Sequence, residues 1–152
     1  KKTQPSYGWW IEQGATTSWE HWNGNASRNH PMFGGGIVWF YRVLAGMKVD
    51  ESKPGYRNII FKPQPAGDVS YVSYFNETPF GTAGIKWTKS KDEFKMDVEV
   101  PVGSTDTVYV PGEKVTEGGN AIKKNEFVKF QKMEGKYSVY TVSSGRYSFT
   151  GK

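Results

Sequence analysis

The stretch Phe94-Lys95-Met96-Asp97-Val98-Glu99-Val100 alternates apolar and charged side chains with a period of two. Successive side chains of a β-strand point to opposite faces of a sheet, so this stretch predicts a strand with one buried face and one solvated face. Runs rich in β-branched and aromatic residues lie on both sides of it. They predict further strands at 57–62, 69–75, 81–88, 107–110, 126–132, 136–142 and 146–150.

Turn-forming residues separate these runs, namely Thr78-Pro79, Ser90-Lys91-Asp92, Pro111-Gly112, Glu134-Gly135 and Ser144-Gly145. Glycine, proline, asparagine, aspartate and serine favour tight reversals of the chain. About eight short strands at regular spacing predict an antiparallel β-sandwich. We therefore expect a mainly β fold for this part of the chain.

Residues 1–49 follow a different pattern and carry five of the six tryptophans, which are Trp9, Trp10, Trp19, Trp22 and Trp39. The charged stretch 50–55 ends in a Pro-Gly turn and predicts a domain boundary, with domains at 1–49 and 50–152. Pro5 and Gly14 predict a short helix that runs to about Gln13. Residues 15–29 are polar, aromatic and rich in glycine and asparagine, which predicts a loop.

The segment between Phe33 and Met47 predicts a second helix that is apolar on all sides. Phe33, Ile37, Tyr41 and Leu44 form one stripe, while Trp39 and Val43 lie on the opposite face. Such a helix is normally buried all round, which the remaining residues cannot easily achieve. We expect this helix to have neighbours outside the chain and, without them, to promote self-association. The opening Lys1-Lys2-Thr3 lacks a methionine, so we expect the chain to be a processed or excised product.

Composition excludes several classes of protein. The chain has no cysteine, which removes disulfide scaffolds and thiol chemistry. Its formal net charge is +5, but the lysines alternate with acids, as at 89–95, so we expect no nucleic-acid partner. No apolar run is long enough to cross a membrane. His21 and His30 lack further ligands at diagnostic spacing, so we expect no metal and no cofactor. The compartment stays open.

The loop from Gly14 to Gly24 is the densest group of chemically active side chains. Glu20 stands between Trp19 and His21, close to Trp22. Tryptophan covers the apolar C–H face of a sugar, and carboxylate and imidazole groups bind its hydroxyls. Trp19 and Glu20 are therefore candidate sugar-site residues. An alternative is that Trp19 and Trp22 are core residues and that Glu20 bonds to the backbone. The sequence alone leaves both open.

Four segments resemble bacterial α-L-rhamnosidases. Residues 8–22, with Gly14-Ala15-Thr16-Thr17-Ser18-Trp19-Glu20, are similar to the signature near the end of the catalytic domain in that family. Residues 27–34, with Asn29-His30, are similar to the next family block. Residues 55–63 resemble the entry to the C-terminal β-sandwich, and residues 142–149 resemble its last hairpin.

This resemblance implies an inverting glycoside hydrolase that removes α-L-rhamnose. The family combines a six-hairpin α/α toroid with a C-terminal β-sandwich, so residues 1–49 would be a loop-plus-helix remnant of the toroid. It implies that Glu20 is the general base and that His30 contacts the rhamnose. The family's general acid lies upstream, and nothing in the family pattern gives Glu12 that role. We expect the chain alone to be inactive.

An alternative function is a non-catalytic carbohydrate-binding module. Aromatic residues of the predicted strands would then line a sugar platform, with Tyr71, Tyr74, Trp87 and Tyr109 as candidates. The opposing interpretation places them in the core or in cross-strand pairs.

Overall fold

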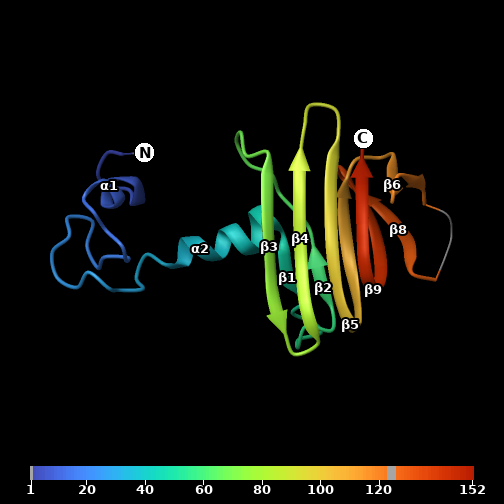
Figure 1. The fold of residues 1–152 in the computed structure, drawn as a ribbon, viewed down its shortest axis with the longest axis horizontal. Helices are drawn as coiled ribbons and strands as arrows, with labels where there is room; N and C mark the ends of the chain where they lie inside the picture. The colour runs from blue at the N-terminus through green and yellow to red at the C-terminus, as the bar shows by residue number, and fades with distance from the viewer. Residues whose placement is uncertain (1, 123–125) are drawn as a thin grey trace. The chain divides into compact units, whose positions relative to one another are not determined.

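The computed structural model describes residues 2–122 and 126–152 and divides into two units, Lys1–Trp39 and Phe40–Lys152 (Figure 1). The first unit is mostly loop with short helices, and the second consists mainly of strands. The division falls inside the predicted second helix, because the residues after Trp39 pack with the sheet. The domain assignment 1–49 and 50–152 itself stays a prediction. None of the helices in the described residues is long and apolar enough to cross a membrane.

The first unit opens with helix α1, Tyr7–Glu12, in the place that Pro5 and Gly14 predicted. Ser6 is its N-cap and accepts a hydrogen bond from the Trp9 N–H at 3.0 Å. Gly14, with φ +80°, follows the last turn in a left-handed conformation that suits glycine. The loop then runs to the short helix α2, Gly35–Trp39.

The predicted helix between Phe33 and Met47 is wrong in its length and in its form. Helix α2 gives way to a π-helix, η1, Phe40–Ala45, and Met47 already belongs to strand β1. Gly46 ends the helical segment, because its φ is +85° and a Cβ there would lie 2.3 Å from the Pro63 nitrogen. The chain turns at this glycine, and the Gly46 carbonyl accepts a hydrogen bond from the Lys62 N–H at 2.6 Å.

The described residues form one sheet of nine strands. In chain order the strands are β1 (Met47–Val49), β2 (Ile59–Phe61), β3 (Tyr71–Thr78), β4 (Gly81–Lys89), β5 (Phe94–Pro111), β6 (Val115–Glu117), β7 (Asn120–Ala121), β8 (Val128–Glu134) and β9 (Tyr137–Gly151). Neighbouring strands are antiparallel, except that β2 and β5 are parallel. The mainly β class is confirmed.

Strands β5 and β9 are each longer than predicted. The runs at 94–100 and 107–110 join in β5, and those at 136–142 and 146–150 join in β9 (Figure 1). The turn predicted at Ser144-Gly145 is therefore wrong. The two strands pair on both sides of a register shift between Val100 and Thr105, and Gly145 pairs with Val100 beside it. Glycine occurs at irregularities within β-strands as well as in turns, so its presence alone does not predict a turn.

Strands β5 and β9 each run through both of two packed layers. The first half of β5 pairs with β4, and the second half pairs with β2. The first half of β9 pairs with β8, and its end pairs with β6. Inward side chains of both layers meet in one core, which includes Trp87, Met96 and Phe149 together with Phe61, Val108 and Val142. Burial of each such side chain contributes roughly 1.5–3 kcal/mol. The Trp87 indole N–H also donates to the Leu44 carbonyl at 3.1 Å, which ties η1 to the sheet.

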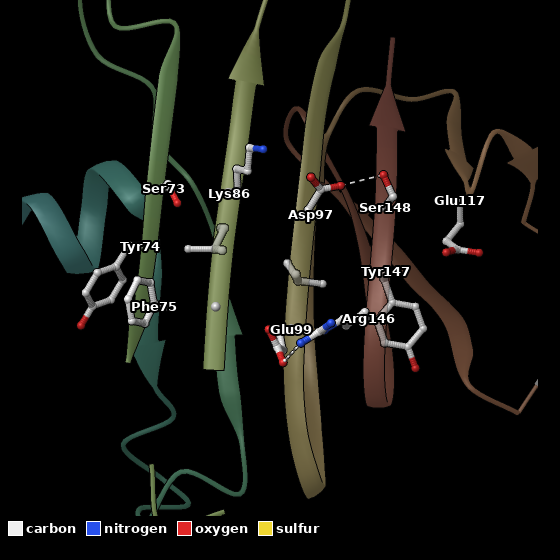
Figure 2. A pocket seen from close by; sticks show the side chains of 13 residues that line it. Ser73, Tyr74, Phe75, Lys86, Asp97, Glu99, Glu117, Arg146, Tyr147 and Ser148 are labelled. Carbon is white, nitrogen blue, oxygen red and sulfur yellow. Dashed lines mark hydrogen bonds and ion pairs between the residues drawn. The ribbon is translucent and has the colours of Figure 1, made fainter. Parts of the chain in front are cut away.

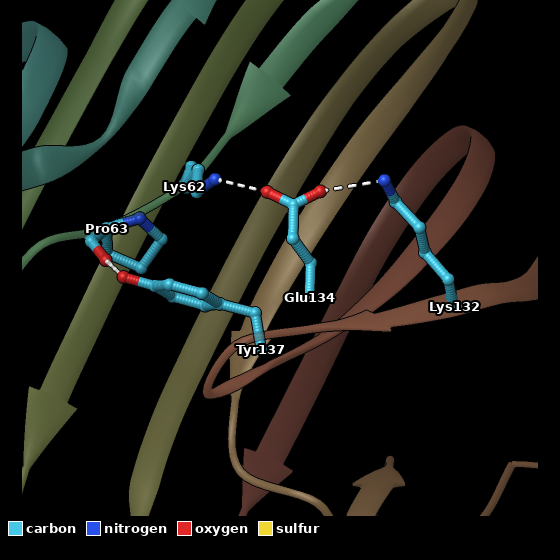
Figure 3. A network of polar contacts seen from close by, with 5 residues as sticks. All are labelled: Lys62, Pro63, Lys132, Glu134 and Tyr137. Carbon is cyan, nitrogen blue, oxygen red and sulfur yellow. Dashed lines mark hydrogen bonds and ion pairs between the residues drawn. The ribbon is translucent and has the colours of Figure 1, made fainter.

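A polar network fastens the segment after β2 to the hairpin between β8 and β9 (Figure 3). The Nζ atoms of Lys62 and Lys132 each lie 2.8 Å from a different carboxylate oxygen of Glu134. Hydrogen bonds from Lys132 and Lys62 lower the pKa of Glu134 to about 2. The network therefore stabilises the fold above the ordinary pKa of 4.5, and its contribution is lost as the pH falls through about 2.

Asp106 is a buried carboxylic acid at the parallel junction of β2 and β5. Its Oδ1 accepts a hydrogen bond from the Ile59 N–H at 2.8 Å. Its Oδ2 is buried and has no hydrogen-bond partner within the described residues. Burial raises the pKa of Asp106 to about 7, partly opposed by the Ile59 hydrogen bond. The native state therefore holds a proton on this carboxyl where the unfolded chain does not.

We expect the free energy of unfolding to fall as the pH rises from about 4 to about 7, on the order of 3 kcal/mol from Asp106 alone. Asp106→Asn should remove most of this fall, since its amide does not titrate. Urea unfolding midpoints between these pH values measure the effect. Asp68→Asn, at an exposed position, should leave the pH dependence as in the unsubstituted chain. An equal slope in the Asp106→Asn variant would contradict the assignment.

Candidate functional site

Glu20 lies in a loop in which residues 18–20 and 27–30 run side by side and are joined by hydrogen bonds; we call it the paired loop. The Glu20 N–H donates to the Ser27 carbonyl at 2.8 Å, and the Ser27 N–H donates back to the Glu20 Oε2 at 3.1 Å. One step further along, the His30 N–H donates to the Ser18 carbonyl at 2.8 Å. These bonds hold 18–20 beside 27–30 and bring Glu20 and His30 into one ladder. Glu20 is half-buried, so its carboxylate remains within reach of solvent.

His30 has a defined orientation in this loop. Its Nδ1 accepts a hydrogen bond from the Met32 N–H at 3.1 Å. A neutral imidazole that accepts at Nδ1 carries its hydrogen on Nε2. Nε2 is thereby set as a donor, and the side chain is half-buried. This geometry suits a hydrogen bond to a ligand hydroxyl.

Trp19 is 4% exposed and is covered by protein on several sides. The Arg28 guanidinium lies 4.8 Å from its ring centroid, and the Trp9 ring meets it edge-on at 6.2 Å. Gly24 packs so closely that a Cβ there would lie 2.7 Å from Trp19. These contacts favour a positioning role for Trp19. Its contact with a sugar stays a prediction.

The other aromatic residues form a cluster that supports the loop. Trp10 is 2% exposed, and its indole N–H donates to the Trp22 carbonyl at 3.0 Å. The Trp10 and Trp22 rings are 4.5 Å apart, and Trp22 lies 4.3 Å from Phe33. Tyr7 donates a hydrogen bond to the Phe33 carbonyl. The packing of Trp10 against Trp22 was not predicted from the sequence, because composition does not distinguish a core tryptophan from a ligand-facing one.

Glu12 occupies a different place from Glu20. It lies at the end of α1, and its carboxylate forms an ion pair with the Lys2 Nζ at 2.7 Å. Both side chains are well exposed, at 43% and 81%. This pairing agrees with a local structural role.

The aromatic platform considered for the sandwich does not form. Trp87 is 1% exposed and belongs to the core. Tyr74 stacks on Tyr41 at 4.7 Å, and Tyr109 meets Tyr137 edge-on at 5.9 Å. Tyr71 alone of the four is largely exposed, at 55%. Trp87 pairs with Val72 in the register of β3 and β4, on the face that packs against the core.

Two family models match most of the chain. Residues 1–44 match the six-hairpin glycosidase domain of bacterial α-L-rhamnosidases, and residues 46–125 match the C-terminal domain of the same enzymes. These matches define the class as a chain that spans the junction of a six-hairpin glycosidase domain and the C-terminal domain that follows it. The chain belongs to the bacterial α-L-rhamnosidase family.

Individual relatives agree with this assignment. An α-L-rhamnosidase from Alteromonas sp. (strain LOR) is 32% identical, over 98% of this chain and 16% of its own length. The structure of α-L-rhamnosidase from Dictyoglumus thermophilum has a TM-score of 0.82 and 40% identity, covering 99% of this chain and 18% of that one. The Streptomyces avermitilis α-L-rhamnosidase, complexed with L-rhamnose, has a TM-score of 0.85 and 26% identity, covering 100% and 15%. The chain thus spans about a sixth of these relatives.

Gly24→Ala should destabilise the first unit, by about 1–3 kcal/mol, because the added methyl group collides with Trp19. The near-ultraviolet circular dichroism of the tryptophans during thermal unfolding measures this loss. Gly14→Ala is the matched control, since its φ is also positive but nothing lies within 4 Å of its Cβ position. Equal losses in the two variants would show that packing against Trp19 does not hold the loop.

Proposed function

We propose that this chain supplies the general base, Glu20, of an inverting α-L-rhamnosidase, and that His30 binds the rhamnose. The main observation that supports this proposal is the paired loop, in which hydrogen bonds bring the segments that contain Glu20 and His30 together. Membership of the family supports the reaction class. The rhamnose complex of the Streptomyces avermitilis relative supports the sugar.

The geometry of Glu20 suits base catalysis. Inversion requires a carboxylate that takes a proton from water while the water attacks the anomeric carbon. The Ser27 N–H orients the carboxylate through Oε2 and leaves Oε1 to accept that proton. The Nε2–H of His30 would donate to a sugar hydroxyl, and Trp19, held by Arg28 and Gly24, would position Glu20 from its neighbouring place in the chain.

The partner acid comes from outside this chain. The two carboxyl groups of an inverting enzyme stand about 6.5–9.5 Å apart, and the acid protonates the leaving oxygen. Glu12 and Glu20 are the only acidic residues before Asp50, and Glu12 is paired with Lys2. We therefore place the acid in the portion of the enzyme that this chain does not span. Loss of one member of a cooperating pair removes most of the rate.

The purified 152-residue chain should release no product from an aryl α-L-rhamnoside above the rate of the buffer. Colour release by the chain and by its Glu20→Gln variant measures this directly, and the two should be indistinguishable. Turnover by the unsubstituted chain that Glu20→Gln abolishes would show that the chain contains its own acid.

We also propose that the isolated chain self-associates through its apolar helical segment. In α2, Ile37 is 49% exposed and Val38 is 47% exposed. Phe40 and Tyr41, at the start of the second unit, are exposed at 54% and 42%. Exposed apolar side chains of this size mark surfaces that contact another chain.

Sedimentation velocity should show a concentration-dependent shift from monomer to a larger species. The double variant Ile37→Ser, Val38→Ser should reduce this shift, because it removes apolar area without touching the sheet. A matched control is Val102→Ser, which alters an isolated exposed valine, 79% exposed, in β5. A sharp monomer at every concentration would contradict the proposal.

A further inference from the structure

A hollow of about 450 Å³ lies on the outer face of the sheet, across strands β3, β4, β5 and β9 (Figure 2). Strand register places the residues of this face in two rows. Residues opposite one another are Phe75, Gly84, Glu99 and Arg146 in one row and Ser73, Lys86, Asp97 and Ser148 in the other. A hollow of this volume falls within the range of small-molecule sites.

Phe75 and Gly84 form the apolar part of the hollow. Phe75 is 67% exposed, whereas Ile85 and Val98 of the neighbouring strands point to the core. A Cβ at Gly84 would lie 3.6 Å from the Phe75 Cβ and 3.7 Å from the Glu99 Cβ. Because Gly84 has no side chain, its backbone forms the bottom of the hollow between the Phe75 ring and the Glu99 carboxylate. The φ of Gly84 is not positive, so backbone strain does not explain the glycine.

The opposite wall of the hollow is polar and is held in place by its own contacts. The Arg146 Nη2 lies 2.8 Å from the Glu99 Oε1, and the Ser148 hydroxyl donates to the Asp97 Oδ1 at 2.7 Å. Figure 2 shows these two pairs stacked one above the other on β5 and β9. Each pair engages one oxygen of its carboxylate, so the second oxygen is placed to accept a hydrogen bond from a ligand.

The charges on this face nearly cancel. Lys86 and Arg146 are cationic, and Asp97, Glu99 and Glu117 are anionic. A site for phosphate, sulfate or a uronic acid would carry an excess of cationic groups. The balance here favours a neutral ligand with many hydroxyl groups.

We propose that this hollow is a second carbohydrate site, in which a neutral pyranose lays its C–H face on Phe75 above Gly84 and hydrogen-bonds to Asp97, Glu99 and Arg146. A pyranose has an apolar C–H face and a polar rim of hydroxyl groups. The apolar and polar parts of the hollow match these two surfaces. The site is separate from Glu20 and His30, and it does not depend on the proposed catalytic role. It would hold a glycan rather than cleave it.

Binding to one sugar should be weak, with a Kd on the order of 1 mM. The test is a titration of the ¹⁵N-labelled full chain with L-rhamnose, D-galactose and D-glucuronate, followed by amide chemical shifts. At least one of the two neutral sugars should shift resonances of β3, β4, β5 and β9 around the hollow. Glucuronate should bind more weakly. Shifts confined to the Glu20 loop, or tighter binding of glucuronate, would overturn the proposal.

Two variants separate the site from general surface effects. Phe75→Ala removes the ring, and Gly84→Val fills the bottom of the hollow without a close backbone contact. Each should weaken neutral-sugar binding at the hollow by about tenfold or more, while the dispersion of other amide signals confirms the fold. Phe130→Ala is the control, because Phe130 is similarly exposed, at 56%, on β8. Unchanged affinity in both Phe75→Ala and Gly84→Val would overturn the proposal.

Discussion

The antiparallel ladder between β5 and β9 is the constraint on which the second unit depends. It extends from Phe94 paired with Gly151 to Pro111 paired with Tyr137, with one register shift between Val100 and Thr105. Among the strands of the described residues, every other pair except β1–β2, β3–β4 and β6–β7 includes β5 or β9. A change of register by one residue would turn the core face outward, so the alternating pattern of β5 specifies the whole arrangement. The outer face that results is held in fixed register, which places Phe75 and Gly84 across from Glu99 and Arg146.

The described residues of the first unit, 2–39, contain no β-strand. Its loop depends on tryptophan packing, because Trp10 of α1 packs against Trp22, and Trp19 packs against Arg28 and Gly24. The two units are therefore stabilised in different ways. A stable sheet forms one unit, and an aromatic cluster presents Glu20 and His30 on the other. Exposed Ile37 and Val38 are the physical sign that α2 lacks cover within the described residues.

Much of the fold could be predicted from the sequence, because period-two alternation at Phe94–Val100 reflects burial directly. The errors arose where one residue type serves two structures. Gly145 indicated a turn but lies within β9, and Met47 continued an apolar pattern but begins β1 after the conformation of Gly46 ends the helix. The composition of its loop singled out Glu20, whereas His30 and the roles of both residues came from the family resemblance, and these roles stay predictions. The burial of Trp19 depends on Gly24 and Arg28, and such packing has no local signature in the sequence.

The central claim is that this chain carries the proton acceptor of a rhamnosidase whose proton donor lies elsewhere. The most direct measurement places this chain in a chimera, where it replaces the matching part of the 40% identical Dictyoglumus thermophilum enzyme. Hydrolysis of an aryl α-L-rhamnoside is followed by proton NMR, which identifies the anomer formed first. We predict the inverted sugar, a loss of about 10²–10⁴ in kcat with Glu20→Gln, and little change with Glu12→Gln. A folded, active chimera in which Glu20→Gln retains the full rate would contradict the claim.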